Sequence, residues 1–224
     1  MIITIDGPAG TGKTTVARLL ALRLGFHYCD TGAMYRAVTY CLLQNAVSLK
    51  NEEALARFLK DIHFEMRLQG DIKRYWVNEE DVTELIRTPH ITASVSEVAA
   101  SPVVRKCLLE WQRVFAQEKS SVFEGRDMGT VVFPNAEIKI FLTARPEIRA
   151  KRRYDEMESC KQEQRQAIIC EEEVLREIKK RDFLDSTRVV APLKAAEDAH
   201  IIDTSELSLE EVVEKILILI PKQK

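Results

Sequence analysis

Short apolar runs rich in β-branched residues alternate along the chain with longer stretches whose apolar residues recur at helical spacing. The short runs predict strands at Ile2 to Asp6, His27 to Cys29, Ser121 to Glu124, Ile138 to Leu142 and His200 to Ile202. The longer stretches predict helices at Thr14 to Leu24, Ala33 to Gln44, Val103 to Glu118, Pro146 to Met157, Glu163 to Asp182 and Leu209 to Ile220. Strands joined by crossovers of this length form a parallel sheet. The pattern therefore predicts an α/β fold, a five-stranded parallel sheet covered by helices on both faces.

One segment, residues 62–82, breaks this rhythm. Apolar and polar residues alternate from Ile62 to Leu68 and again from Ile72 to Val77, on either side of a turn that contains Gly70. Alternation around a glycine turn is typical of an antiparallel hairpin. A second turn at Asn78 and Glu79 precedes a short third strand. We expect a small antiparallel β subdomain inserted into a single domain that spans residues 1–224, because no linker rich in Ser or Pro separates two parts.

Composition narrows the function. The chain has 224 residues with 33 Lys and Arg against 35 Asp and Glu, a net charge of −2, so no excess of positive charge favours nucleic acid or a membrane surface as a partner. The longest apolar run, Ile216 to Ile220, is far shorter than a membrane span, and residues 1–3 lack the basic and long apolar stretches of a signal peptide, so we expect neither. The five cysteines and four histidines lack the spacing of disulfide frameworks or zinc sites. We expect a cytoplasmic protein, monomeric because no heptad pattern argues for assembly.

The most specific short motif follows the first predicted strand. Residues 7–14, Gly-Pro-Ala-Gly-Thr-Gly-Lys-Thr, fit the pattern G-x-x-x-x-G-K-[ST], with a strand before them and an amphipathic helix after them. The glycines let successive backbone N–H groups face one anion, and the N-terminus of the helix adds partial positive charge. Lys13 is then placed to neutralise β- and γ-phosphate oxygens, and the Thr14 hydroxyl to ligate Mg²⁺. The motif predicts a nucleoside triphosphate site.

Guanine-dependent switches share this loop but carry further motifs. No glycine of the chain has an aspartate three residues before it, and no N-K-x-D sequence occurs. The sequence therefore argues against a GTPase.

Arginines and carboxylates gather in four compact signatures: residues 30–36 (DTGAMYR), 124–130 (EGRDMGT), 149–153 (RAKRR) and 181–188 (RDFLDSTR). Transfer of a phosphoryl group between two anions requires positive charge around both. Arg126 and Asp127 follow a predicted parallel strand, at the carboxyl end where open α/β sheets bind their ligands. Arg181 and Asp185, at i, i+4 spacing, also fit an ordinary surface pair.

Together these stretches closely resemble bacterial-type cytidylate kinases, which are nucleoside monophosphate kinases of the P-loop class. The likeness covers nearly the whole chain and is densest at residues 3–14, 30–36, 125–134 and 181–193. It implies transfer of the γ-phosphoryl group of ATP to CMP or dCMP, giving ADP and CDP or dCDP, with Mg²⁺ as the cofactor. It also implies that residues 60–100 form the inserted monophosphate-binding subdomain and residues 145–182 a helical lid region.

The resemblance carries site residues over motif by motif. A catalytic part is implied for Lys13, Arg126, Arg153 and Arg188. ATP binding is implied for Gly7, Pro8, Ala9, Gly10, Thr11, Gly12, Lys13, Thr14, Thr15, Arg149 and Arg152, with Thr14 as the metal ligand. CMP binding is implied for Thr31, Arg36, Ser96, Arg105, Arg126, Asp127, Arg181, Asp185 and Arg188. Glu124 departs from the family pattern, in which Asp is more usual before Gly-Arg-Asp.

The chemistry of cytosine agrees with two of these roles. Its exocyclic amino group is a donor beside acceptors at N3 and O2, so Asp127 would accept from the amino group while Arg105 donates to the acceptors. Uracil reverses two of these positions and would leave buried groups unpaired, at about 1–3 kcal/mol each. Two alternatives remain open: a kinase for another small acceptor such as UMP, and a nucleotide-gated switch with slow turnover.

Overall fold

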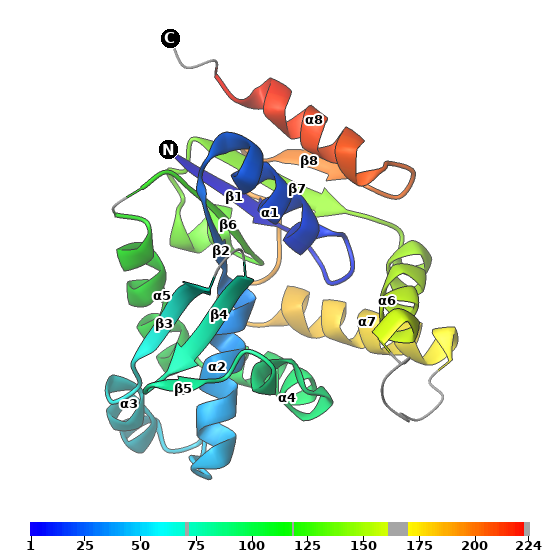
Figure 1. Cartoon of the computed structure of the whole chain (residues 1–224). Coiled ribbons are helices and arrows are strands. Elements are labelled where there is room, and N and C mark those ends of the chain that lie inside the picture. The colour runs from blue at the N-terminus through cyan, green and yellow to red at the C-terminus, as the bar shows by residue number, and fades with distance from the viewer. Residues whose placement is uncertain (70–71, 118, 161–169, 222–224) are drawn as a thin grey trace. The chain divides into compact units, whose positions relative to one another are not determined.

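The computed structural model describes residues 1–69, 72–117, 119–160 and 170–221 (Figure 1). The chain divides into two compact units. The first contains Met1–Cys29 and Glu118–Lys224, and the second contains Asp30–Gln117. The predicted insertion at residues 60–100 therefore belongs to the second unit, and the predicted lid region at 145–182 to the first.

The first unit is built on a parallel sheet. Its strands are β1 (Ile2–Asp6), β2 (His27–Asp30), β6 (Ser121–Gly125), β7 (Ile138–Thr143) and β8 (His200–Asp203). They lie in the order β2-β6-β1-β7-β8, and β1 runs parallel to both β6 and β7. The five-stranded parallel sheet is confirmed. The register places Asp6 opposite Gly125 and Phe141, so the carboxyl ends of β1, β6 and β7 meet at one edge.

Two helices cover one face of this sheet. Both α1 (Lys13–Leu24) and α8 (Leu209–Leu219) pack against the buried aliphatic residues of β1, β6 and β7. The shared core has these fully or almost fully buried members: Ile3, Ile5, Val16, Leu20, Val122, Ile140, Leu142, Val213 and Ile216. A capping box at Ser208 and Glu211 starts α8. The opposite face carries Phe123, whose ring lies 4.5 Å from that of Phe133.

Two further helices, α6 (Pro146–Cys160) and α7 (Glu171–Thr187), lie side by side in the first unit (Figure 1). Ala150 of α6 and Val174 and Ile178 of α7 form the small apolar core between them. The predicted helix Glu163 to Asp182 was too short at its C-terminal end, because α7 continues to Thr187. Residues 163–169 of that prediction, and residues 161–169 of the predicted lid region, lie outside the described residues.

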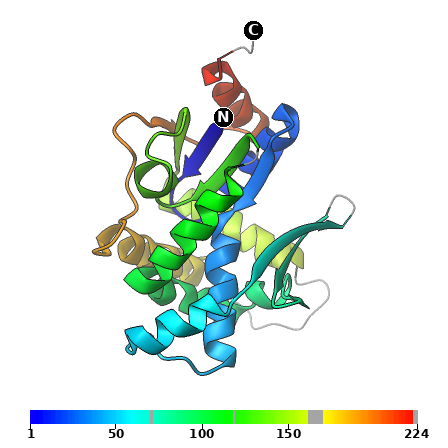
Figure 2. The same ribbon diagram turned by 90° about the vertical axis from the view of Figure 1, so that its left-hand side faces the viewer.

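The second unit combines helices with the predicted hairpin. Strands β3 (Phe64–Gln69) and β4 (Ile72–Val77) pair antiparallel, and β4 pairs with the short β5 (Glu80–Asp81). Figure 2 shows β3 and β4 as a twisted ribbon in teal. The inserted antiparallel sheet is thus confirmed. Its turn at Asn78 and Glu79 has positive φ values of 46° and 71°.

The helices of this unit are α2 (Thr31–Gln44), α3 (Glu52–Lys60), α4 (Pro89–Ala100) and α5 (Pro102–Phe115), with a 3-10 turn at Leu85–Arg87. Asp30 caps α2 by accepting a hydrogen bond from the Ala33 amide, which starts this helix two residues before the predicted boundary. The predicted helix at Val103 to Glu118 ends earlier, at Phe115. Phe64 of β3 stacks on Trp111 of α5 with ring centroids 6.1 Å apart, which anchors the hairpin to the helices.

No helix within the described ranges has both the length and the apolar character needed to cross a membrane.

Candidate active site

The glycine-rich loop connects β1 to α1, as its motif predicts. Gly7 has φ of +146°, and a Cβ atom there would lie 2.1 Å from the backbone oxygen of Leu142 in β7. Gly10 has φ of +78°, and its Cβ would meet Arg149 at 2.9 Å. Only glycine fits these two positions, because the backbone conformation and the neighbouring chain both exclude a side chain. The loop is therefore held close to β7 and to α6.

Lys13 is the first residue of α1 and is almost fully buried. Its Nζ donates a hydrogen bond of 2.7 Å to the Pro8 carbonyl within the same loop. Burial, and then the positive charge of Arg126, lower the pKa of Lys13 well below its ordinary value, while Glu124 acts in the opposite direction and Arg181 again lowers it. A buried ammonium among guanidinium groups is an arrangement that a bound polyanion stabilises.

Glu124 lies at the end of β6, beside β1, and is almost fully buried. Its Oε2 accepts a hydrogen bond of 3.0 Å from the Thr14 hydroxyl, and its Oε1 accepts one from the Tyr28 hydroxyl of β2. Tyr28 was not predicted as a site residue. The Glu124 carboxylate therefore lies next to the Thr14 hydroxyl, which the motif predicts as a metal ligand.

Arginines surround the carboxylate of Asp185 in α7. Arg126 donates through Nε to Asp185 Oδ2 at 3.0 Å, Arg181 approaches the same oxygen at 4.0 Å, and Arg188 Nη1 lies 3.9 Å from Oδ1. Arg188 Nη2 also lies 3.6 Å from Asp127 Oδ1. The structure brings these five predicted CMP-binding residues of the first unit into one cluster. Asp185 and Asp127 are buried, and the nearby guanidinium groups compensate their negative charges.

The predicted ATP-site residue Arg149 is buried in α6 and touches the glycine-rich loop. It donates through Nη1 to the Ala9 carbonyl at 3.1 Å and through Nε to the Ala144 carbonyl at 2.9 Å. Its Nη2 forms an ion pair of 2.7 Å with Asp182 of α7. Arg149 thereby ties the loop to both helices.

The two neighbouring arginines of α6 have different surroundings. Arg152 donates to Thr204 Oγ1 at 3.0 Å, and the Thr204 hydroxyl in turn donates to the Thr11 carbonyl at 3.2 Å. Arg153 is exposed and pairs with Glu156 one turn along the same helix. The catalytic part of Arg153 stays a prediction.

Four predicted CMP-binding residues lie in the second unit: Thr31, Arg36, Ser96 and Arg105. Arg36 of α2 donates to Thr92 Oγ1 at 2.7 Å, next to Ser96 on the same helix α4. Arg105 of α5 is buried, lies over the Tyr35 ring at 5.5 Å and donates to the Ala99 carbonyl at 3.1 Å. Helices α2, α4 and α5 pack together and position these side chains.

Two buried residues that sequence reasoning missed lie against the predicted site. Asp6 is the last residue of β1 and accepts two backbone hydrogen bonds from the turn after Asp127. Thr204 follows β8 and joins Arg152 to the glycine-rich loop. The position of Asp6, immediately before Gly7 of the motif, could have indicated that Asp6 lies near the site. Nothing in the local sequence marks Thr204, because its partners are distant along the chain.

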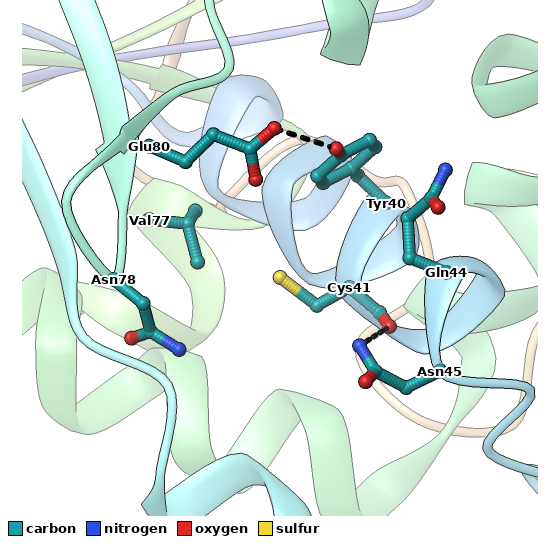
Figure 3. A pocket seen from close by; sticks show the side chains of 7 residues that line it. All are labelled: Tyr40, Cys41, Gln44, Asn45, Val77, Asn78 and Glu80. Carbon is teal, nitrogen blue, oxygen red and sulfur yellow. Dashed lines mark hydrogen bonds between the residues drawn. The ribbon is translucent and has the colours of Figure 1, made fainter.

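A hollow of about 240 Å³ in the second unit is lined by residues of α2 and of the hairpin (Figure 3). The Tyr40 hydroxyl donates to Glu80 Oε1 at 2.9 Å, and Asn45 Nδ2 donates to the Cys41 carbonyl. Burial, with a smaller contribution from Glu80, raises the pKa of the Cys41 thiol to about 11. The lining contains none of the predicted site residues.

Comparison with known proteins adds the family. The model of the cytidylate kinase family matches residues 3–222. The chain belongs to the cytidylate kinase family. It is 52% identical to the cytidylate kinase of Protochlamydia amoebophila over 97% of this chain and 95% of that one, and 49% identical to that of Carboxydothermus hydrogenoformans over 100% and 98%.

Solved structures agree at the level of the fold. A protein of Eubacterium ventriosum described as uncharacterized superposes with a TM-score of 0.52 at 15% identity, and the match covers 97% of this chain and 96% of that one. The sequence comparison with other cytidylate kinases, rather than this structural likeness, carries the family assignment.

Proposed function

We propose that this cytidylate-kinase-family chain transfers the γ-phosphoryl group of ATP to CMP or dCMP and releases ADP and CDP or dCDP. Membership of the family over nearly the whole chain supports the reaction. No comparison favours another acceptor such as UMP or a nucleotide-gated switch. We assign the reaction to the cytoplasm and to a monomer, with ATP and the cytidine monophosphate as small-molecule partners.

The single observation that carries the mechanism is the set of cations next to the glycine-rich loop. Lys13 and Arg126 lie close enough for the guanidinium to lower the pKa of the buried ammonium. Arg126 also belongs to the cluster of Arg181 and Arg188 around Asp185. The attacking phosphate oxygen is already anionic, so no strong general base is needed. Charge stabilisation and in-line positioning of two anions account for the catalysis.

The residues present suit Mg²⁺. This ion prefers oxygen ligands and commonly takes only one or two from the protein, the remainder coming from phosphates and water. The hydroxyl of Thr14, in the motif that binds phosphate, lies 3.0 Å from the carboxylate of Glu124 in β6. We assign Thr14 as a ligand and Glu124 as the carboxylate that orients the surrounding water. Held there, the ion would supply positive charge against the phosphate oxygens.

We assign recognition of cytosine to Asp127, Arg105 and Ser96, and of the acceptor phosphate to Arg36 and Arg126. The inserted subdomain at residues 60–100 would bind the monophosphate, and the region 145–182 would contact ATP. Arg149 supports this second assignment, because it donates to a carbonyl of the glycine-rich loop. A carboxylate acceptor and a guanidinium donor that both bind the base would discriminate cytosine from uracil by donor and acceptor pattern.

Substitution of Lys13 tests the mechanism. We expect Lys13→Ala to lower kcat by roughly a hundredfold or more, because it removes charge stabilisation of the transferred group. Lys215→Ala is the matched control, since Lys215 is an exposed lysine of α8. Steady-state kinetics with MgATP and CMP measure both. Near-normal turnover of Lys13→Ala would contradict the assignment.

A further inference from the structure

The carboxylate of Asp6 joins the first strand to the turn that carries Arg126 and Asp127. Asp6 ends β1 and is 4% exposed. Its Oδ1 accepts from the Met128 amide at 2.9 Å, and its Oδ2 accepts from the Gly129 amide at 2.8 Å. Both carboxylate oxygens are thus committed to the backbone of one turn, 122 and 123 residues further along the chain.

The turn held in this way is unusual. Residues Met128–Val132 form a π-helical turn directly after Asp127, and such turns are rare and often found at functional sites. The Gly129 position is tightly enclosed, because a Cβ atom there would lie 3.0 Å from Thr4 Oγ1. The Asp127 carbonyl accepts from the Val131 amide at 2.9 Å, within the same turn. The backbone that presents Arg126 and Asp127 is therefore fixed at its next two amides by Asp6.

The other neighbour of Asp6 is the glycine-rich loop, which begins at Gly7. The loop is fixed at Gly7 by its close approach to the carbonyl of Leu142. Asp6 therefore connects the loop that the motif assigns to ATP with the turn that the family resemblance assigns to CMP. We propose that Asp6 is a positioning residue, which sets the placement of Arg126 and Asp127 relative to the glycine-rich loop without touching either substrate.

The hydrogen bonds between Asp6 and this turn are expected to depend on pH. Burial raises the pKa of Asp6 to about 6, the two backbone hydrogen bonds oppose this rise, and the charge of Asp127 adds to it while that of Lys13 lowers it. Lys139 of the adjacent β7 is engaged with Asp198 at 2.7 Å. Above this pKa both carboxylate oxygens accept hydrogen bonds. Below this pKa one oxygen carries a proton and accepts less strongly than a carboxylate oxygen does, so one of the two hydrogen bonds is weakened.

Asp6→Asn is the direct test, because it imitates the neutral carboxyl group at nearly constant shape. We expect kcat/KM for CMP to fall by up to roughly a hundredfold near pH 8, because a misplacement of about 1 Å at the reacting groups can reduce the rate that much. The ratio of wild-type to variant kcat/KM should then fall several-fold as pH decreases through about 6. Ionisation of the CMP phosphate affects both proteins alike and cancels in this ratio.

Glu137→Gln is the matched control. Glu137 accepts from the Ile2 amide at 2.8 Å, at the other end of β1, so it is also a carboxylate that binds a backbone amide of this strand region. We expect its kcat/KM to equal that of the wild type at every pH. If Asp6→Asn loses thermal stability while its activity ratio stays flat with pH, Asp6 is only structural and the proposal is overturned.

Nuclear magnetic resonance of the wild-type chain without substrate keeps the test valid if Asp6→Asn does not fold. The amide signals of Met128 and Gly129 should shift with a common midpoint near pH 6, and signals that stay constant from about pH 5 to about pH 8 would overturn the proposal. This inference rests on the proposed function for its kinetic part. Absence of CMP phosphorylation by the wild type would refute the function, whereas equal activity of wild type and Asp6→Asn would refute the positioning role alone.

Discussion

The arginine pair Arg149 and Arg153 offers a comparison of two guanidinium groups four residues apart on α6. Arg149 has a side chain 4% exposed, pairs with Asp182 at 2.7 Å and donates to the carbonyls of Ala9 and Ala144. Arg153 has a side chain 49% exposed and pairs only with Glu156 among the described residues. Replacement of either by Met removes the charge and keeps most of the apolar stem.

We expect the two substitutions to lower the free energy of unfolding by amounts that differ several-fold. Removal of one partner of a buried ion pair costs about 3–5 kcal/mol, because the remaining charge is left uncompensated. The Asp182 side chain is 25% exposed and recovers some hydration, so we expect Arg149→Met to lower the free energy of unfolding by about 3 kcal/mol, the low end of that range. An exposed pair at i, i+3 contributes at most about 0.5 kcal/mol. Arg153→Met should therefore remain within that value of the wild type.

Urea unfolding followed by circular dichroism measures both variants. A double variant, Arg149→Met with Asp182→Asn, adds a second check, because neutralising the abandoned carboxylate should restore part of the loss. If the free energies of unfolding of Arg149→Met and Arg153→Met differ by less than about 1 kcal/mol, the buried ion pair of Arg149 does not stabilise the chain as proposed here.

Three further predictions address other parts of the molecule. Gly7→Ala should destabilise the chain by about 3 kcal/mol or more in urea unfolding, because its Cβ would lie 2.1 Å from a β7 carbonyl, whereas Gly25→Ala, with nothing within 4 Å, should cost only about 1 kcal/mol; equal costs would contradict the steric argument. Because the pKa of the Cys41 thiol is raised to about 11, only about one molecule in a thousand carries the thiolate near pH 8, and alkylation of Cys41 should accelerate as pH rises toward 11. Mass spectrometry should find the exposed Cys170 modified before Cys41, and the reverse order would contradict this prediction. Asp127→Ala should reduce the preference for CMP over UMP more than it raises KM for ATP, and a change confined to the ATP constant would show that Asp127 serves the other substrate.

The parallel sheet was predictable because each strand is a compact β-rich run followed by a crossover segment. Residues 3–6 and 138–140 are buried on both faces, and β-branched apolar residues predominate in both strands. The hairpin was predictable for a different reason, since one of its faces is polar and its residues alternate.

The sequence did not predict two helices: α4, whose local signals are weak, and α3, which is short. Helix α4 contains the β-branched residues Ile91, Thr92, Val95 and Val98, which lower intrinsic helix propensity, and packing against α2 stabilises it instead. Helix α3 has the ordinary signals, a capping Asn51 and acidic residues in its first turn, but it is only nine residues long. Near the end of α7 the Asp185 carbonyl accepts a hydrogen bond from the Leu193 amide, in the segment that follows the helix.

The candidate site was predictable where its residues form contiguous motifs and not where it depends on strand adjacency. The glycine-rich loop and the Arg126-Asp127 pair could be found in the sequence. The contact between Thr14 and Glu124 spans 110 positions and exists because β1 lies beside β6. The hydrogen bonds of Asp6 follow from the same adjacency. Such partners become visible only once the order of strands is known.

We propose that this chain binds two nucleotides and transfers a phosphoryl group to the one that carries cytosine. A coupled assay with MgATP and equal concentrations of CMP, dCMP, UMP or AMP tests it most directly. We expect rapid formation of ADP with CMP or dCMP. With UMP and AMP we expect kcat/KM to be at least roughly tenfold lower, because a mismatched base leaves polar groups of the site unpaired. Equal rates with all four acceptors, or turnover that no acceptor stimulates, would contradict it.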